Sequence, residues 1–184
     1  MPGLIILVVV LVVVVIAIVA IYNGMIAMRE QVNNAWSQID VQLKRRYDLI
    51  PNLIETVKGY MAHEKDTLER VIQARNGALS ATGVNDKAAA DSKVTAALGG
   101  IFALAEAYPD LKSNENMLSL QEELKSTENK VSFARQYYND AVTTFNTKIQ
   151  TFPSSILAGM FGFKGRELFM VDDAIEREPV KVKF

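Results

Sequence analysis

Residues 4–21 read LIILVVVLVVVVIAIVAI, an unbroken apolar run that decides the fold. As an α-helix the run rises about 27 Å at roughly 1.5 Å per residue, close to the hydrocarbon thickness of a bilayer. A cleaved signal peptide is the alternative, but no Lys or Arg precedes the run, and Ile18 and Ala20 form a poor cleavage site. We therefore predict a retained membrane anchor over residues 1–24, with these anchoring positions: Leu4, Leu7, Leu11, Ile16, Ile21 and the interfacial Tyr22.

The basic residues predict which side of the membrane the rest of the chain occupies. No Lys or Arg lies before the run, whereas Arg29 and the triplet Lys44, Arg45 and Arg46 follow it. Positive charge is retained on the cytoplasmic side of single-pass proteins. We therefore expect a single-pass protein whose remaining chain lies on the cytoplasmic side.

Beyond the anchor, apolar residues recur at alternating steps of three and four, which is the spacing of one helical face. A long seam of this kind runs through Met117, Leu120, Leu124, Thr127, Val131, Ala134, Tyr138, Ala141 and Phe145. A helix with such a coiled-coil-like stripe needs partner helices to cover it. The pattern predicts an all-α fold, in which the transmembrane helix is followed by an antiparallel helical bundle over 25–151 and a short irregular C-terminal tail over 152–184.

Loop-forming residues predict the ends of these helices. An Ala-rich helix is expected over about 87–107, and its Gly99 and Gly100 are explained by close packing against a neighbouring helix, since glycine costs about 1 kcal/mol in a helix interior. Ser113 is the expected N-cap of the long helix over about 114–150.

A charged block precedes a proline in the first part of the predicted bundle and is a candidate interaction site. It contains Asp40, Lys44, Arg45, Arg46, Asp48 and Pro51. The basic residues either bind phosphates or anionic lipid or, as we favour, form a solvated helix face with local ion pairs. Pro51 removes one helical hydrogen bond, so we expect the helix to break or kink sharply there.

The tail contains a dense apolar cluster over residues 154–163, at Ile156, Leu157, Met160, Phe161 and Phe163. The cluster either folds back to close one end of the bundle, which we favour, or presents an apolar patch to a membrane or a partner. The last residues, 179–184, alternate apolar side chains with lysines, as a short strand or extended arm would.

Composition excludes several classes of function. The 184 residues carry 20 Lys and Arg against 21 Asp and Glu, so there is no field to attract nucleic acid. There is no cysteine and one histidine, His63, and no serine lies in a nucleophile-elbow sequence. We therefore expect neither a metal nor another cofactor, and no enzymatic activity.

Four sequence blocks suggest a family. They are VNNAWSQIDVQLKRR at 32–46, DLIPNL at 48–53, YPDLK at 108–112 and ARQYYN at 134–139. Together they resemble the LemA family over nearly the whole chain. The resemblance implies a bacterial protein with one N-terminal membrane helix and an antiparallel helical bundle, and it offers no catalytic or ligand residues to carry over.

These observations favour a noncatalytic function. We expect a membrane-anchored scaffold that self-assembles into homo-oligomers or organises other membrane proteins through its helical faces. The alternative is a lipid-binding or membrane-remodelling protein that uses residues 154–163. Membrane lipid is an expected partner in either case.

Overall fold

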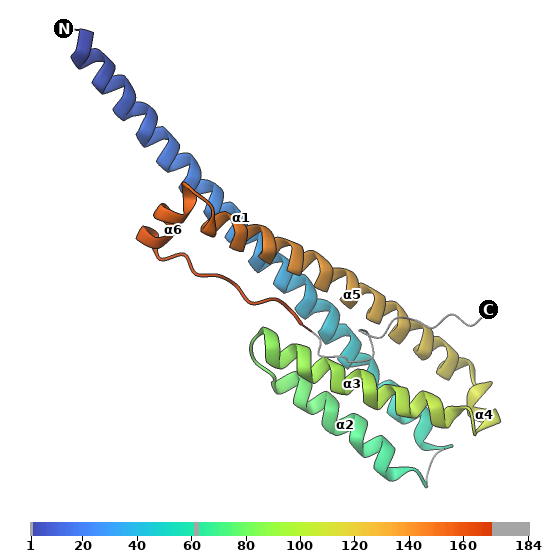
Figure 1. Ribbon diagram of the computed structural model, residues 1–184. Coiled ribbons are helices and arrows are strands. Elements are labelled where there is room, and N and C mark those ends of the chain that lie inside the picture. Colours follow the sequence, from blue (N-terminus) through green and yellow to red (C-terminus); the bar gives the residue numbers. More distant parts are fainter. Residues whose placement is uncertain (1, 61–62, 171–184) are drawn as a thin grey trace, which may run out of the picture. The chain divides into compact units, whose positions relative to one another are not determined.

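The computed structural model describes residues 2–60 and 63–170 (Figure 1). The helices are α1 (Pro2–Lys58), α2 (Lys65–Ser80), α3 (Val84–Ala105), α4 (Pro109–Lys112), α5 (Glu115–Gln150) and α6 (Ser154–Phe161), and no strand occurs in these two ranges. The predicted all-α fold is confirmed. The strand or arm predicted over 179–184 lies outside the described residues.

The chain divides into two compact units, and both long helices contribute to each. Unit 1 comprises residues 1–38 and 136–168, and unit 2 comprises residues 39–135 and 169–184. The division predicted from the sequence, at residues 24 and 151, stays a prediction.

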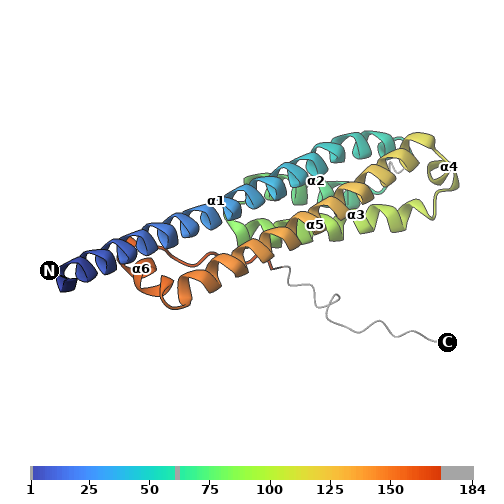
Figure 2. The ribbon, with the colours of Figure 1, turned by 90° about the horizontal axis from the view of Figure 1, so that it is seen from above.

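Unit 1 pairs the first part of α1 with the last part of α5, which runs in the opposite direction (Figure 2). The pair buries the following apolar side chains: Met25, Val32 and Ala35 from α1, and Tyr138, Ala141, Val142, Phe145 and Ile149 from α5. Trp36 is half-buried, and its ring centroid lies 5.5 Å from that of Tyr138. Aromatic pairs at such a separation contribute about 0.5–1.5 kcal/mol beyond their burial.

Unit 2 combines the second part of α1 and the first part of α5 with α2, α3 and α4. Helices α2 and α3 form an antiparallel hairpin (Figure 1). Residues at the predicted helical spacing are buried in this unit: Ile39, Leu43, Ile50 and Val57 of α1, Leu68 and Val71 of α2, and Met117, Leu124, Thr127 and Val131 of α5. The predicted apolar faces therefore form the core.

The predicted break at Pro51 is wrong, because α1 continues through this proline to Lys58, and the alternative of a sharp kink there stays a prediction. Proline has no N–H to donate to the carbonyl four residues earlier, which belongs to Tyr47. Arg75 of α2 supplies the missing donor, since its Nε lies 2.8 Å from the Tyr47 carbonyl oxygen. A side chain from the neighbouring helix thus replaces the hydrogen bond that proline removes.

Three further sequence expectations need correction. The helix predicted from residue 87 begins at Val84, after Gly83 with a φ of +89°. Asn114 rather than Ser113 caps α5, because its Oδ1 accepts the Met117 N–H at 3.1 Å. Close packing does not account for Gly99, since a Cβ there would have no neighbour within 4 Å.

Candidate interaction surfaces

The first part of α1 is exposed along its whole apolar run. The predicted anchoring residues Leu4, Leu7, Leu11 and Ile16 are 66, 64, 61 and 62% exposed, while Ile21 and Tyr22 are half-buried. Helix α1 is long and apolar enough to cross a membrane, and none of its most apolar window is buried inside the protein. So large an apolar surface is stable in contact with lipid rather than water.

Helix α3 is also long and apolar enough to span a bilayer by composition. It nevertheless buries Asp91, whose carboxylate is bound to Arg46. An apolar helix with an ion-paired side chain and a packed face is typical of a protein core. We therefore assign the membrane-crossing role to α1.

An aromatic cluster forms in unit 1 where the apolar run of α1 ends. The ring of Tyr22 lies 4.8 Å from that of Phe161 and 5.9 Å from that of Phe163. The Phe163 ring also lies 6.4 Å from that of the buried Phe145 of α5. These contacts hold α6 against α1 at the level of Tyr22 (Figure 1).

The segment after α6 is held by side chains of α5. Gly162 ends α6 in the left-handed conformation, with a φ of +71°, which glycine adopts without steric cost. The Asn146 side chain then accepts from the Arg166 N–H at 2.8 Å and donates to its carbonyl at 2.9 Å. The Tyr138 hydroxyl donates to the Glu167 carbonyl at 2.8 Å, so the segment has a defined path.

The apolar tail cluster has a buried part, as expected if it packs inside the chain, and an exposed part, as expected if it presents an apolar patch. Leu157 is buried and Phe163 is half-buried, in agreement with packing inside the chain. Ile156, Met160 and Phe161 are 57, 74 and 53% exposed. Helix α6 therefore has one face packed within unit 1 and one apolar face uncovered.

In the charged block, Arg46 is buried rather than solvated. Its Nη1 donates to Asp91 Oδ1 at 3.0 Å, and its Nη2 donates to Thr95 Oγ1 at 3.0 Å and forms an ion pair with Glu128. The Tyr47 hydroxyl donates to the same Asp91 oxygen at 3.2 Å. The expectation that the whole basic triplet is a solvated face is thus wrong for Arg46, whose charge is neutralised inside unit 2.

The rest of the charged block stays near the surface. Asp40 pairs with Lys87 of α3, and the exposed Arg45 lies 3.9 Å from Glu123 of α5. Lys44 and Asp48 are exposed. Pro51 is also exposed, so the block does not form one continuous binding site.

Burial dominates the electrostatics around Arg46. Loss of water raises the pKa of the Asp91 and Glu128 carboxyls, because the charged form is disfavoured there, although Arg46 opposes the effect. Burial and the charge of Asp91 also raise the pKa of the Tyr47 phenol. Tyr47 is therefore a neutral hydrogen-bond donor, and the cluster is a structural network.

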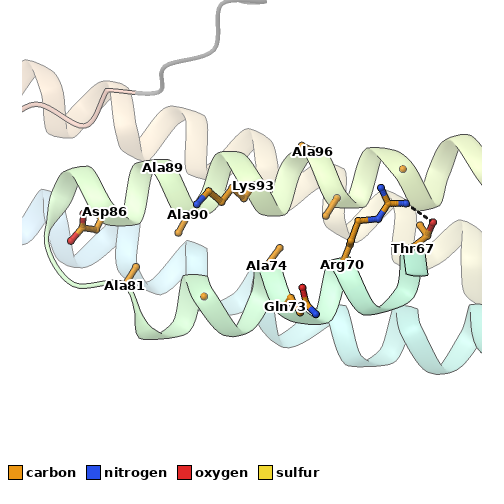
Figure 3. Close-up of a pocket in the computed structure, with 13 residues that line it drawn as sticks. Thr67, Arg70, Gln73, Ala74, Ala81, Asp86, Ala89, Ala90, Lys93 and Ala96 are labelled. Carbon is orange, nitrogen blue, oxygen red and sulfur yellow. Dashed lines mark hydrogen bonds between the residues drawn. The ribbon is translucent and has the colours of Figure 1, made fainter. Parts of the chain in front are cut away.

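An open groove of about 740 Å³ lies between α2 and α3 of unit 2 (Figure 3). Most of its lining residues are alanine or glycine: Ala74, Gly77, Ala81, Ala89, Ala90, Ala96, Ala97 and Gly100. A Cβ at Gly77 would meet nothing within 4 Å, and one at Gly100 would meet only Thr67 at 3.9 Å. The chain's own packing therefore does not require glycine at these two positions.

Charged side chains line this groove, with Asp86 and Arg70 toward opposite ends and Lys93 between them (Figure 3). Asp86 lies at the end that contains Ala81, whereas Arg70 lies at the other end beside Thr67 (Figure 3). Arg70 bonds within its own helix, donating to Thr67 Oγ1 at 2.9 Å. Sequence reasoning missed this groove, because an Ala-rich helix gives no apolar stripe from which a binding face can be recognised.

Comparison with known proteins identifies relatives over most of the chain. The LemA family profile matches residues 35–184. Protein LemA of Metamycoplasma hominis is 28% identical over 160 residues, which is 86% of this chain and 72% of that relative. Magnetosome protein MamQ of Magnetospirillum gryphiswaldense and Magnetosome protein MamQ 2 of Paramagnetospirillum magneticum are each 26% identical over 80% of this chain. The chain spans 64% of the length of each magnetosome protein, and none of these names denotes an enzyme.

Proposed function

The chain belongs to the LemA family and is a helical, membrane-associated protein, and from this we propose that it is a non-enzymatic scaffold. In this proposal α1 anchors the chain in a bacterial cell membrane, with unit 2 on the cytoplasmic side. Copies of the chain assemble with one another, and organise other membrane proteins, through their helical faces. The observation that carries the proposal is the small-residue groove between α2 and α3.

Small side chains make this groove suitable for another helix. Alanine and glycine allow two helix backbones to approach closely, so that dispersion contacts accumulate over the length of the contact. Ile72 and Leu79 of α2 are also 42 and 50% exposed and add apolar area on the same helix. We propose that the occupant is the α2–α3 face of a second copy.

Anchoring strengthens any such contact. Two chains held in one membrane are confined to a plane, which raises their effective concentration without new contacts. A weak interface is therefore sufficient for assembly in the membrane. The same interface would be difficult to detect with dilute protein in detergent.

The absence of cysteine from the sequence allows a clean test by crosslinking. A cysteine in place of Ala90, inside the groove, is introduced into the full chain in lipid vesicles, and Ser126 on the exposed face of α5 is the matched control position. We expect oxidation to give disulfide-linked dimers through position 90 much faster than through position 126. Equal rates at the two positions, or monomers by mass measurement in native-lipid particles, would contradict the proposal.

The exposed face of α6 favours a second candidate function, in which the chain binds lipid through this helix. Ile156 and Met160 lie four residues apart on α6 and are 57 and 74% exposed, and Phe152, in the turn before α6, is 81% exposed. The helix is held beside Tyr22, where the apolar run of α1 ends. We propose that this face lies in the membrane interface, as apolar faces of interfacial helices do.

A polarity-sensitive fluorophore tests the position of this face. Attached to a cysteine in place of Met160 in vesicle-reconstituted full chain, it should report an apolar environment. The same fluorophore at Leu118, which is 50% exposed on α5 in unit 2, should report water. A water-like signal at both positions would exclude the interfacial placement.

A further inference from the structure

A small basic pocket lies in unit 1 beside the aromatic cluster that contains Tyr22. It has a volume of about 230 Å³, and its lining includes Arg29, Phe145, Phe161, Phe163, Lys164 and Arg166. Arg29 comes from α1, Phe145 from α5, and the other four side chains from the end of α6 and the segment that follows. Three cations and three aromatic rings therefore converge where α1 leaves its apolar run.

The cations of this pocket are only partly neutralised. The Arg29 Nε donates to Glu30 at 3.3 Å, and the guanidinium carbon lies 5.8 Å from the Phe163 ring centroid. Asn33 and Arg29 hold the pKa of Glu30 below its usual value, and Arg166 adds to this. One carboxylate thus faces two arginines, while Lys164 is exposed. The pocket keeps an excess of positive charge.

The backbone that carries two of these cations is fixed. The Asn146 side chain forms hydrogen bonds with both the N–H and the carbonyl of Arg166. A Cβ at Gly165 would lie 3.3 Å from Asn146 Oδ1, so a larger residue would push the two apart. A pocket with a defined backbone loses less entropy on binding than a mobile loop.

We propose that Arg29, Lys164 and Arg166 bind the phosphate of an anionic phospholipid. Arginine forks suit phosphate oxygens, and the neighbouring rings of Phe161 and Phe163 give the glycerol and upper acyl region an apolar surface. The proposal rests on the placement of α6 in the membrane interface. It goes further by assigning the headgroup chemistry and the residues that recognise it.

A free phosphate has the same charge, but the surroundings of the pocket favour a lipid. Phe152, Ile156 and Met160 leave a large exposed apolar face on the same segment of unit 1. The Tyr22 ring, in direct contact with Phe161, marks the end of the apolar run. A phosphate bound here is therefore at the depth of a headgroup, with room for acyl chains beside α6.

The test uses the full chain in mild detergent and counts bound lipids by native mass spectrometry. Phosphatidylglycerol is compared with phosphatidylcholine, for the natural chain and for the variant Arg29→Gln/Lys164→Gln/Arg166→Gln. The matched control is Lys65→Gln/Lys125→Gln/Lys130→Gln, which removes the same charge from exposed positions in unit 2. Inorganic phosphate is added in a separate competition arm.

The proposal expects at least a tenfold loss of phosphatidylglycerol binding in the pocket variant, little change in the control variant, and no displacement by millimolar inorganic phosphate. Equal losses in both variants would mean that the attraction is general, and would overturn the site. Displacement by inorganic phosphate would overturn the assignment to lipid. If the fluorophore at Met160 reports an apolar environment while the pocket variant binds normally, the placement of α6 stands and the phosphate site fails.

Discussion

The pairing of Arg75 with the Tyr47 carbonyl gives the sharpest test of how α1 passes through Pro51. Arg75→Ala removes the only donor described for a carbonyl that Pro51 leaves without its helical partner. Hydrogen bonds from charged donors contribute about 1.5–3 kcal/mol. For a chain of this length that loss lowers Tm by about 3–12 °C, at roughly 2–4 °C per kcal/mol.

A double-mutant cycle separates this cause from a general loss of packing. In the background of Pro51→Ala, the new N–H can donate to the Tyr47 carbonyl as in any helix. Arg75→Ala should then cost about 1–2 kcal/mol less than it does in the natural chain, and this difference is the coupling energy. Pro51→Ala alone should stabilise by less than the ~3 kcal/mol typical of a helix-interior proline, because Arg75 already compensates in part.

The assay is thermal and denaturant unfolding of the full chain in detergent micelles, followed by far-ultraviolet circular dichroism. Arg70→Ala is the control, since Arg70 lies on the same helix and its hydrogen bonds stay within α2. Its cost should be the same in both backgrounds. If Arg75→Ala costs the same whether residue 51 is proline or alanine, replacement of the proline's missing donor is not the role of Arg75.

Three further outcomes are expected. Arg46→Met leaves the buried Asp91 carboxylate and the half-exposed Glu128 carboxylate without their cation. It should lower the free energy of unfolding by about 3–5 kcal/mol, with partial recovery on adding Asp91→Asn in denaturant titrations; no recovery would contradict the network. Burial raises the pKa of the Asp91 carboxyl in the folded state above its unfolded value of about 3.9. Between these two pKa values the folded state binds more protons than the unfolded state. The stability contributed by protonated Asp91 is therefore lost as pH rises from about 3.9 through the pKa of the folded state. Asp91→Asn should flatten that part of the Tm profile against pH, and an unchanged slope would count against the assignment. Tyr138→Phe should cost about 1 kcal/mol and speed amide exchange after α6 without affecting α2, because it removes the 2.8 Å bond to the Glu167 carbonyl; uniform exchange changes would argue for a global effect instead.

Hydrophobic spacing was enough to predict the helices and their buried faces. The seam from Met117 to Phe145 is almost entirely buried, and the spacing from Met25 to Leu43 marks the face of α1 that packs on its neighbours. The apolar run of residues 4–21 was equally clear, because a helix that is apolar on all sides must be covered all round, as a bilayer covers it. The spacing of apolar residues shows which face of a helix is buried, and a short stretch of sequence is enough to read it.

The roles of Arg46 and Pro51 depend on residues far away in the sequence. The residues of a basic triplet do not themselves show whether its side chains are solvated or buried. Arg46 is buried because it pairs with Asp91, which lies 45 residues later in the sequence. In the same way, the donor that allows α1 to continue through Pro51 belongs to Arg75 of another helix. Neither pairing leaves a periodic signal, so the sequence alone favoured a solvated face and a broken helix.

In the proposed function, large apolar residues attach the chain to the membrane, whereas small apolar residues select its partner. The exposed Val, Leu and Ile side chains of α1 carry large apolar areas, and each methylene removed from water contributes about 0.8 kcal/mol, whatever the identity of the neighbouring molecule. The alanines of the α2–α3 groove offer little area, but they let another backbone come close enough for its shape to matter. Under the proposed function, attachment is therefore strong and unselective, whereas assembly would be weak and sensitive to a single added side chain. A scaffold needs this combination, because a selective contact that is weak in solution becomes effective once both partners share a membrane.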